Sequence, residues 1–212
     1  MNLVDSAVAN LITGFTRALT SAQARWIGCA PEDVQRVYFG NHASHADFAL
    51  VWASLPPGLR ARTRPVAGAD YWLRGGLRSY LIRRVLNAVL IERNRKDDPG
   101  HDSTAPLVAA LDAGDSLILF PEGTRNCTEE RLLPFRSGVF HVASRRPEIE
   151  LVPVWMENSG RVLPKGESIP LPMLCTVNFG APLRILPEEP KSTFIDRARG
   201  ALLALADSVN PS

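Results

Sequence analysis

His42 and Asp47 have the residue types and the spacing of a general base and the carboxylate that orients it. They lie in the segment N-H-A-S-H-A-D-F at residues 41–48, between an expected strand over residues 36–40 and an apolar run over residues 48–55. If a helix begins between them, an aspartate in its first turn points back toward the histidine. A histidine held in this way can remove the proton of an attacking alcohol, as in hydrolase triads but without an enzyme serine.

The same segment admits two other interpretations. Ser44-x-x-Asp47 also resembles a capping box at a helix start, which would leave His42 as an ordinary loop residue. His42, His45 and Asp47 together could hold zinc, but their spacing matches no standard zinc pattern, so we expect no metal. A lipid hydrolase would normally need a G-x-S-x-G serine elbow, and the sequence contains none.

A second segment, F-P-E-G-T-R at residues 120–125, directly follows a buried-strand run over residues 116–120. Its glycine permits a close backbone approach or an unusual turn, and its arginine offers a fork for a phosphate group. Taken alone, the segment could be a plain strand-to-turn transition. Loops at strand ends are nevertheless where α/β sheets carry their sites.

The elements that position these segments alternate between strand and helix. Apolar residues recur at helical spacing over residues 3–26, which predicts an amphipathic helix that either packs on the core or lies in a membrane interface. Further helices are expected over residues 72–86 and 103–112. Strands are expected over residues 36–40, 64–67, 88–92, 116–120, 149–156 and 175–180. This order predicts an α/β fold with a mixed or mostly parallel central sheet flanked by helices.

Length and composition fit a single domain. The 212 residues are 45% hydrophobic, which suffices for one full core. We expect an N-terminal amphipathic helix region over residues 1–30 and a catalytic domain over residues 31–212. The sequence shows no secretory signal pattern and no apolar run near the ~18 to 20 residues of a spanning helix. Three widely separated cysteines suit a reducing cytoplasm.

Basic residues concentrate between residues 60 and 96, where ten arginines and lysines stand against two acidic residues. Such a region can face phospholipid head groups, a phosphorylated substrate or nucleic acid, or be merely solvated. A non-catalytic module that binds anionic lipid or nucleic acid is therefore the rival hypothesis. Aromatic residues for base stacking are sparse there, so we expect no nucleic-acid partner.

Taken together, the segments resemble the 1-acylglycerol-3-phosphate acyltransferase family, whose blocks N-H-x-x-x-x-D and F-P-E-G-T-R occur here in the expected order. Weaker matches are V-L-I-E-R at 89–93, V-P-V at 152–154 and F-R-S-G at 135–138, which is similar to the family's F-K-x-G. The resemblance runs from Val37 to Leu183. The segment V-L-I-E-R, which corresponds to the family's second block, lacks the glycine that often precedes the strand there. Arg93 is therefore the least secure of the residues that the resemblance assigns to the site.

The resemblance implies that His42 is the general base and Asp47 its partner. It implies a substrate-binding set made of Arg93, Glu122, Gly123, Thr124, Arg125 and Arg136. The implied reaction moves a fatty acyl group from acyl-CoA or acyl-carrier protein to the free hydroxyl of lysophosphatidate, without a cofactor. Glycerol 3-phosphate and other lysophospholipids remain open as acceptors. Many relatives carry hydrophobic membrane helices before this domain, whereas this sequence offers the amphipathic segment 3–26. We therefore expect a peripheral protein at the inner face of the membrane.

Overall fold

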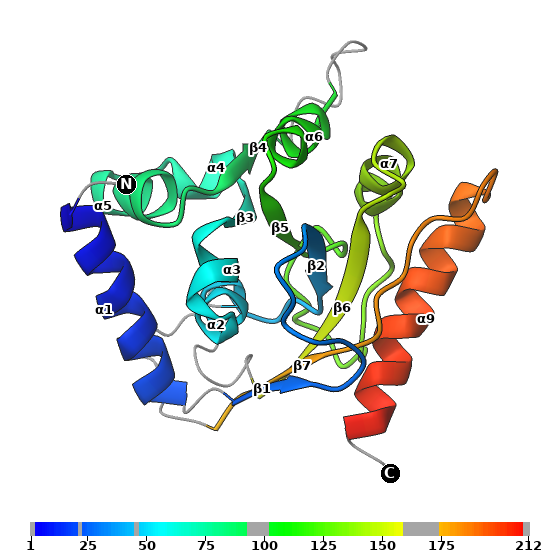
Figure 1. Cartoon of the computed structure of the whole chain (residues 1–212), viewed down its shortest axis with the longest axis horizontal. Helices are drawn as coiled ribbons and strands as arrows, with labels where there is room; N and C mark the ends of the chain where they lie inside the picture. Colours follow the sequence, from blue (N-terminus) through cyan, green and yellow to red (C-terminus); the bar gives the residue numbers. More distant parts are fainter. Residues whose placement is uncertain (1–2, 21–22, 45–46, 93–101, 159–173, 210–212) are drawn as a thin grey trace.

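The computed structural model describes residues 3–20, 23–44, 47–92, 102–158 and 174–209 (Figure 1). Within these ranges, seven strands form one sheet in the order β1-β7-β6-β2-β5-β3-β4. All neighbouring pairs are parallel except β6 and β7, which run antiparallel. The strands are β1 Gln23–Trp26, β2 Arg36–Gly40, β3 Thr63–Gly68, β4 Val89–Ile91, β5 Ser116–Leu119, β6 Glu150–Glu157 and β7 Thr176–Phe179. The predicted α/β class with a mostly parallel sheet is confirmed.

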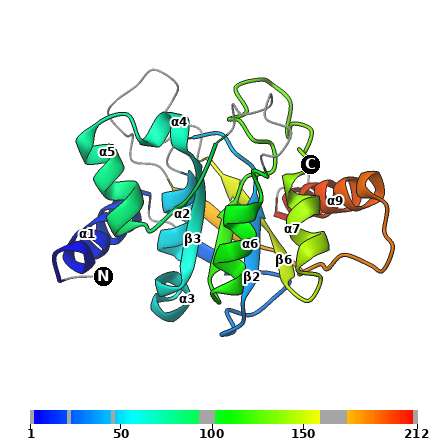
Figure 2. The ribbon, with the colours of Figure 1, turned by 90° about the horizontal axis from the view of Figure 1, so that it is seen from above.

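Helices cover both faces of the sheet (Figure 2). On one face lie α1 Leu3–Thr20, α2 Asp47–Ser54 and the π-helical turn η1 Leu81–Val85, preceded by α3 Pro57–Ala61, α4 Ala69–Trp72 and α5 Gly76–Tyr80. On the other face lie α6 Ala105–Asp112, α7 Gly138–Arg145 and α9 Lys191–Val209. No helix in the described ranges combines the length and apolar character needed to cross a bilayer.

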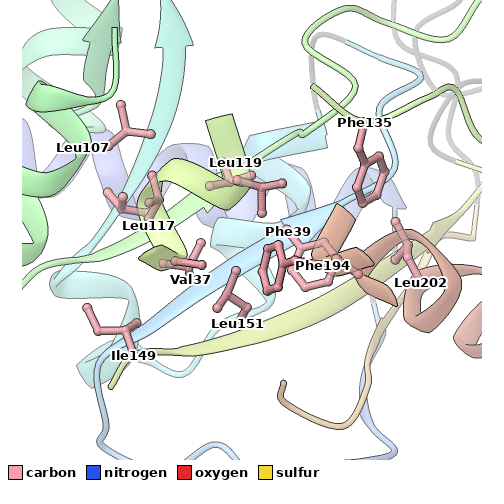
Figure 3. Packing of buried hydrophobic residues seen from close by; sticks show 14 of the residues in the cluster. Val37, Phe39, Leu107, Leu117, Leu119, Phe135, Ile149, Leu151, Phe194 and Leu202 are labelled. Atoms are coloured by element: carbon pink, nitrogen blue, oxygen red, sulfur yellow. The ribbon is translucent and has the colours of Figure 1, made fainter. Parts of the chain in front are cut away.

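Alternation along the central strand β2 divides the core into two clusters. Val37 and Phe39 point to the face covered by α6, α7 and α9, whereas Tyr38 points to the face of α1 and α2. Figure 3 shows the first of these clusters, where Phe39 packs with Phe194 of α9 and Leu151 of β6. Every residue of β2 is buried, because helices cover the sheet on both sides. The strand end that carries His42 is therefore held in the middle of a rigid scaffold.

The N-terminal helix was predicted to extend to residue 26, and this is wrong. Helix α1 ends at Thr20, and residues Gln23–Trp26 form the edge strand β1, parallel to β7. Trp26 stacks on Phe179 of β7 with ring centroids 4.0 Å apart. Backbone pairing with a strand some 150 residues away along the chain overrides the local helical periodicity. The boundary expected at residue 30 stays a prediction, and residues 23–26 belong to the sheet.

The single helix predicted over residues 72–86 is also wrong. The segment divides into α4, α5 and η1, and residues 73–75 separate α4 from α5. Gly75 has φ +102°, a conformation that glycine adopts without the steric cost other residues meet. Helix α6 begins at Ala105, two residues later than expected, because the Asp102 carboxylate accepts hydrogen bonds from Thr104 in the preceding turn.

Candidate active site

His42 and Asp47 meet as the spacing predicted. Strand β2 ends at Gly40 and Asp47 is the first residue of α2, so its side chain points back over the connecting loop. The Asp47 Oδ2 atom lies 2.9 Å from His42 Nδ1 and accepts hydrogen bonds from the backbone N–H groups of Ala43 and Ser44 at 2.7 and 2.8 Å. A carboxylate only accepts, so Nδ1 carries the proton and Nε2 is left as the basic atom.

The surroundings of this pair keep it fixed. Asp47 is fully buried, and His42 is mostly buried. The imidazole stacks on the Phe120 ring with centroids 4.4 Å apart and planes 10° from parallel. The imidazole is thus hydrogen bonded to a carboxylate through Nδ1 and packed face to face against the Phe120 ring. Such a histidine can receive a proton at Nε2 without reorienting.

The backbone of His42 is held by the second segment. Its N–H donates to Glu122 Oε1 at 2.7 Å, and its carbonyl accepts from the Asn126 N–H at 2.6 Å. The two sequence blocks, 80 residues apart, are therefore bonded directly to one another at the base. This contact brings the two blocks together in one site.

Glu122 is buried, and both of its carboxylate oxygens accept hydrogen bonds from backbone groups. Oε1 accepts from His42, and Oε2 accepts from the Leu133 N–H at 3.0 Å. Burial raises the pKa of the Glu122 carboxyl, and the two backbone donors oppose that rise. The pocket beside His42 is lined by other residues of the segment but not by Glu122. The geometry connects this carboxylate to the loop that carries the base.

Gly123 has a left-handed backbone conformation, and a side chain there would displace the Arg136 side chain. Its φ is +70°, and a Cβ atom there would lie 2.5 Å from Arg136 Cδ. Arg136 lies against the turn because its backbone N–H donates to the Pro121 carbonyl at 2.8 Å and its side-chain Nε–H donates to the Glu122 carbonyl at 3.3 Å. The glycine thus lets the Arg136 guanidinium approach the site closely.

A pocket of about 700 Å³ opens at the carboxyl ends of the parallel strands. His42 lines it together with Gly123, Thr124, Arg125 and Arg136, so five of the eight expected site residues share one cavity. Much of the remaining lining is apolar and includes Phe48, Val66, Trp72, Ile91, Leu107 and Val139, and Glu92 lines the cavity as well. In the part of the chain that the structure describes, neither arginine pairs with a carboxylate. The cavity therefore offers a base, two cations and an apolar wall.

Two of the expected site residues, Asp47 and Glu122, do not line the cavity but are hydrogen bonded to His42. Arg93 lies outside the described residues. His45, the third member of the zinc alternative, also lies outside them. Among the residues with described positions, no three histidine, cysteine, aspartate or glutamate side chains are grouped as metal ligands.

Asn41 is a site residue to which the sequence analysis assigned no role. Its side-chain amide donates to the Met156 carbonyl at 3.0 Å, and its oxygen accepts from the Met156 N–H at 2.8 Å. These two bonds tie the end of β2 to β6 immediately before His42. The only signal in the sequence was an amide residue at a strand end next to the candidate base, because its partner is 115 residues away.

Comparison with known proteins places these features in a family. Residues 29–157, more than half of the chain, match the model of the Acyltransferase family. The chain is 33% identical over 142 residues to the 1-acyl-sn-glycerol-3-phosphate acyltransferase of Cocos nucifera. The aligned region covers 62% of this chain and 43% of that relative. The enzyme of the same name from Haemophilus influenzae is 28% identical over 124 residues, covering 53% and 46%. The chain thus spans a little under half the length of these curated relatives.

The fold has a solved counterpart. The crystal structure of the 1-acyl-sn-glycerophosphate (LPA) acyltransferase PlsC from Thermotoga maritima superposes with a TM-score of 0.73 and covers 98% of this chain and 82% of that one, at 18% identity. At 18% identity the structural likeness shows a shared fold alone. The family model matches residues 29–157, which include both sequence blocks. The resemblance drawn from the two blocks is confirmed: the chain belongs to the Acyltransferase family.

Proposed function

We propose that this chain transfers a fatty acyl group from an acyl thioester to the free hydroxyl of lysophosphatidate, giving phosphatidate. The observation that carries the proposal is one cavity lined by the His42 base, by Arg125 and Arg136, and by several apolar side chains. A lysophosphatidate offers a hydroxyl, a phosphate and an acyl chain, which match these three features. The relatives from Cocos nucifera and Haemophilus influenzae are both named 1-acyl-sn-glycerol-3-phosphate acyltransferase, which supports this acceptor.

In the proposed mechanism, His42 Nε2 takes the hydroxyl proton as the acceptor oxygen attacks the carbonyl carbon of the thioester. The buried Asp47 carboxylate stabilises the imidazolium that forms. The carbon–sulfur bond then breaks, and the proton on the imidazolium passes to the departing thiolate. The products are an ester and a free thiol, so these steps balance without a cofactor. Positioning of acceptor and donor in the cavity supplies much of the rate.

The donor in this proposal is acyl-CoA or acyl-carrier protein. The basic residues between 60 and 96 suit either, because coenzyme A carries phosphates and carrier proteins have acidic surfaces. The acceptor is a membrane lipid, so the proposal includes peripheral association with a membrane at its cytoplasmic face.

Arg125→Ala tests the phosphate assignment. We expect the KM for lysophosphatidate to rise by about 10- to 100-fold with a smaller change in kcat, because a charge-assisted hydrogen bond is worth about 1.5–3 kcal/mol. Steady-state kinetics at saturating donor measures both constants. Arg184→Ala is the matched control, since Arg184 is exposed and pairs with Glu150 away from the pocket. An unchanged KM in the Arg125 variant contradicts a phosphate contact at this position.

A further inference from the structure

The loop between β5 and α7, residues 120–137, carries Glu122 near its start and folds back on itself. Its two ends are bonded to each other, since the Arg136 backbone N–H donates to the Pro121 carbonyl at 2.8 Å. A loop of this length keeps one conformation only where neighbouring elements hold it in place. The contacts at the middle of the loop therefore bear on the position of Glu122.

Helix α9 holds the middle of this loop at residues 131 and 132. The Arg199 guanidinium donates from Nη2 to the Leu132 carbonyl at 2.7 Å. Arg131 forms an ion pair with Asp207, about two turns further along α9. The Leu132 side chain is buried in the same apolar cluster as Leu202 of α9, which is labelled in Figure 3. The loop is thus attached to α9 by a hydrogen bond, an ion pair and apolar packing.

The contact with Arg199 reaches Glu122 through a single peptide group. The Leu132 carbonyl and the Leu133 N–H belong to one planar trans unit, so they point in opposite directions. The carbonyl accepts from Arg199, and the N–H donates to Glu122 Oε2 at 3.0 Å. A cation that binds a carbonyl oxygen polarises the peptide group and strengthens the hydrogen bond that its N–H donates. Arg199 therefore orients and strengthens one of the bonds that hold the Glu122 carboxylate.

The other oxygen of Glu122 completes the connection to the base. Oε1 accepts from the His42 backbone N–H at 2.7 Å. Burial raises the pKa of the Glu122 carboxyl, and the bond from Leu133 is the largest influence that lowers this pKa. Only the ionised carboxylate has both oxygens free to accept, so support for the Leu133 bond also supports the bond to His42. In the described part of the chain Arg199 pairs with no carboxylate, so its charge is directed at this peptide group.

We propose that Arg199 is a positioning residue for the His42 base. It acts from α9 through the peptide group between Leu132 and Leu133 and then through the Glu122 carboxylate. This inference rests on the proposed function in one respect, since it takes His42 to be the base of acyl transfer. Arg199 does not line the cavity, so its removal should displace His42 and leave the contacts of a bound substrate in place.

Arg199→Met tests the proposal, because methionine keeps much of the apolar stem and removes the guanidinium. We expect kcat to fall by about tenfold, less than the ~10²-fold loss that a 1 Å misplacement can cause, with the KM for lysophosphatidate unchanged. Arg199→Lys keeps a charged donor and should retain most of the kcat. Arg197→Met is the matched control, since Arg197 of the same helix also donates to a backbone carbonyl at 2.7 Å, that of Arg184.

Two further measurements separate positioning from a general loss of stability. In the Glu122→Ala background, Arg199→Met should lower kcat no further, because the connection to His42 is already broken. Hydrogen–deuterium exchange should be faster over residues 41–44 and 122–133 in Arg199→Met than in the wild type, and unchanged there in Arg197→Met. Thermal unfolding checks that each variant is folded, and Arg199→Gln, which also lacks the charge, replaces a methionine variant that is not.

Wild-type kcat and wild-type exchange in Arg199→Met overturn the proposal, as does an equal loss in Arg197→Met. A loss that multiplies in the Glu122→Ala background contradicts the connection through Glu122, and an Arg199→Lys variant as slow as Arg199→Met contradicts the bond to the Leu132 carbonyl. The exchange measurement needs no substrate. If the wild type acylates no lysolipid, the proposed function fails, while faster exchange around His42 in Arg199→Met alone still supports the connection from α9.

Discussion

His42→Ala is expected to lower kcat by about 10²- to 10⁴-fold, the usual contribution of a positioned general base. The KM values should change little, because the cations and the apolar wall of the pocket remain in place. Asp47→Asn is expected to act more subtly. An asparagine oxygen at the place of Oδ2 can still accept from His42, Ala43 and Ser44, but it brings no charge to stabilise an imidazolium.

Non-additivity distinguishes a working pair from two separate structural residues. If Asp47 acts only through His42, removing His42 already abolishes the contribution of both residues to kcat. His42→Ala/Asp47→Asn should therefore be no slower than His42→Ala alone. His141→Ala is the matched control, since His141 is exposed on α7. Losses that multiply in the double variant, or a His42 variant with wild-type kcat, contradict the assignment of His42 as the base.

Glu122→Ala is expected to lower kcat strongly while leaving the KM for lysophosphatidate nearly unchanged. The substitution removes the buried carboxylate that accepts from the His42 N–H and from the Leu133 N–H, which are both partly buried. Each donor left unsatisfied costs about 1–3 kcal/mol, so the free energy of unfolding should fall as well. The loop that carries the base then loses its fixed position. Steady-state kinetics and thermal unfolding together measure these effects.

Glu122→Gln separates positioning from substrate binding. A glutamine side chain keeps one acceptor oxygen, so the variant should recover part of the kcat and part of the stability lost in Glu122→Ala. The family resemblance implied that Glu122 contacts the acceptor, and that reading predicts a raised KM in both variants. A KM effect as large as that of Arg125→Ala, with kcat preserved, contradicts a positioning role.

Local sequence patterns predicted the elements around the site well, and the reason is physical. The meeting of His42 and Asp47 follows from a loop of a few residues and the direction of a side chain in a first helical turn. The strands β2, β5 and β6 were predictable because a sheet covered on both faces produces continuous apolar runs. These features depend on residues that are near in sequence.

The features that the sequence did not predict depend on distant partners. Strand β1 exists because β7 is beside it, and the role of Glu122 follows from backbone amides at two other points of the chain. The periodicity of α1 predicted an apolar side but not which of its residues face the core. Part of that arrangement is a hydrogen bond from Tyr80 to the buried Asp5, 75 residues apart in sequence.

The most direct test of the account is thiol release from a long-chain acyl thioester by the purified chain, with and without lysophosphatidate. Acyl-CoA and acyl-carrier protein serve as donors in parallel, and the lipid product is identified by mass spectrometry. The account predicts release that requires lysophosphatidate, matched mole for mole by phosphatidate. Release without acceptor would identify a thioesterase instead, and no release with either donor on any lysolipid would contradict the proposed transfer.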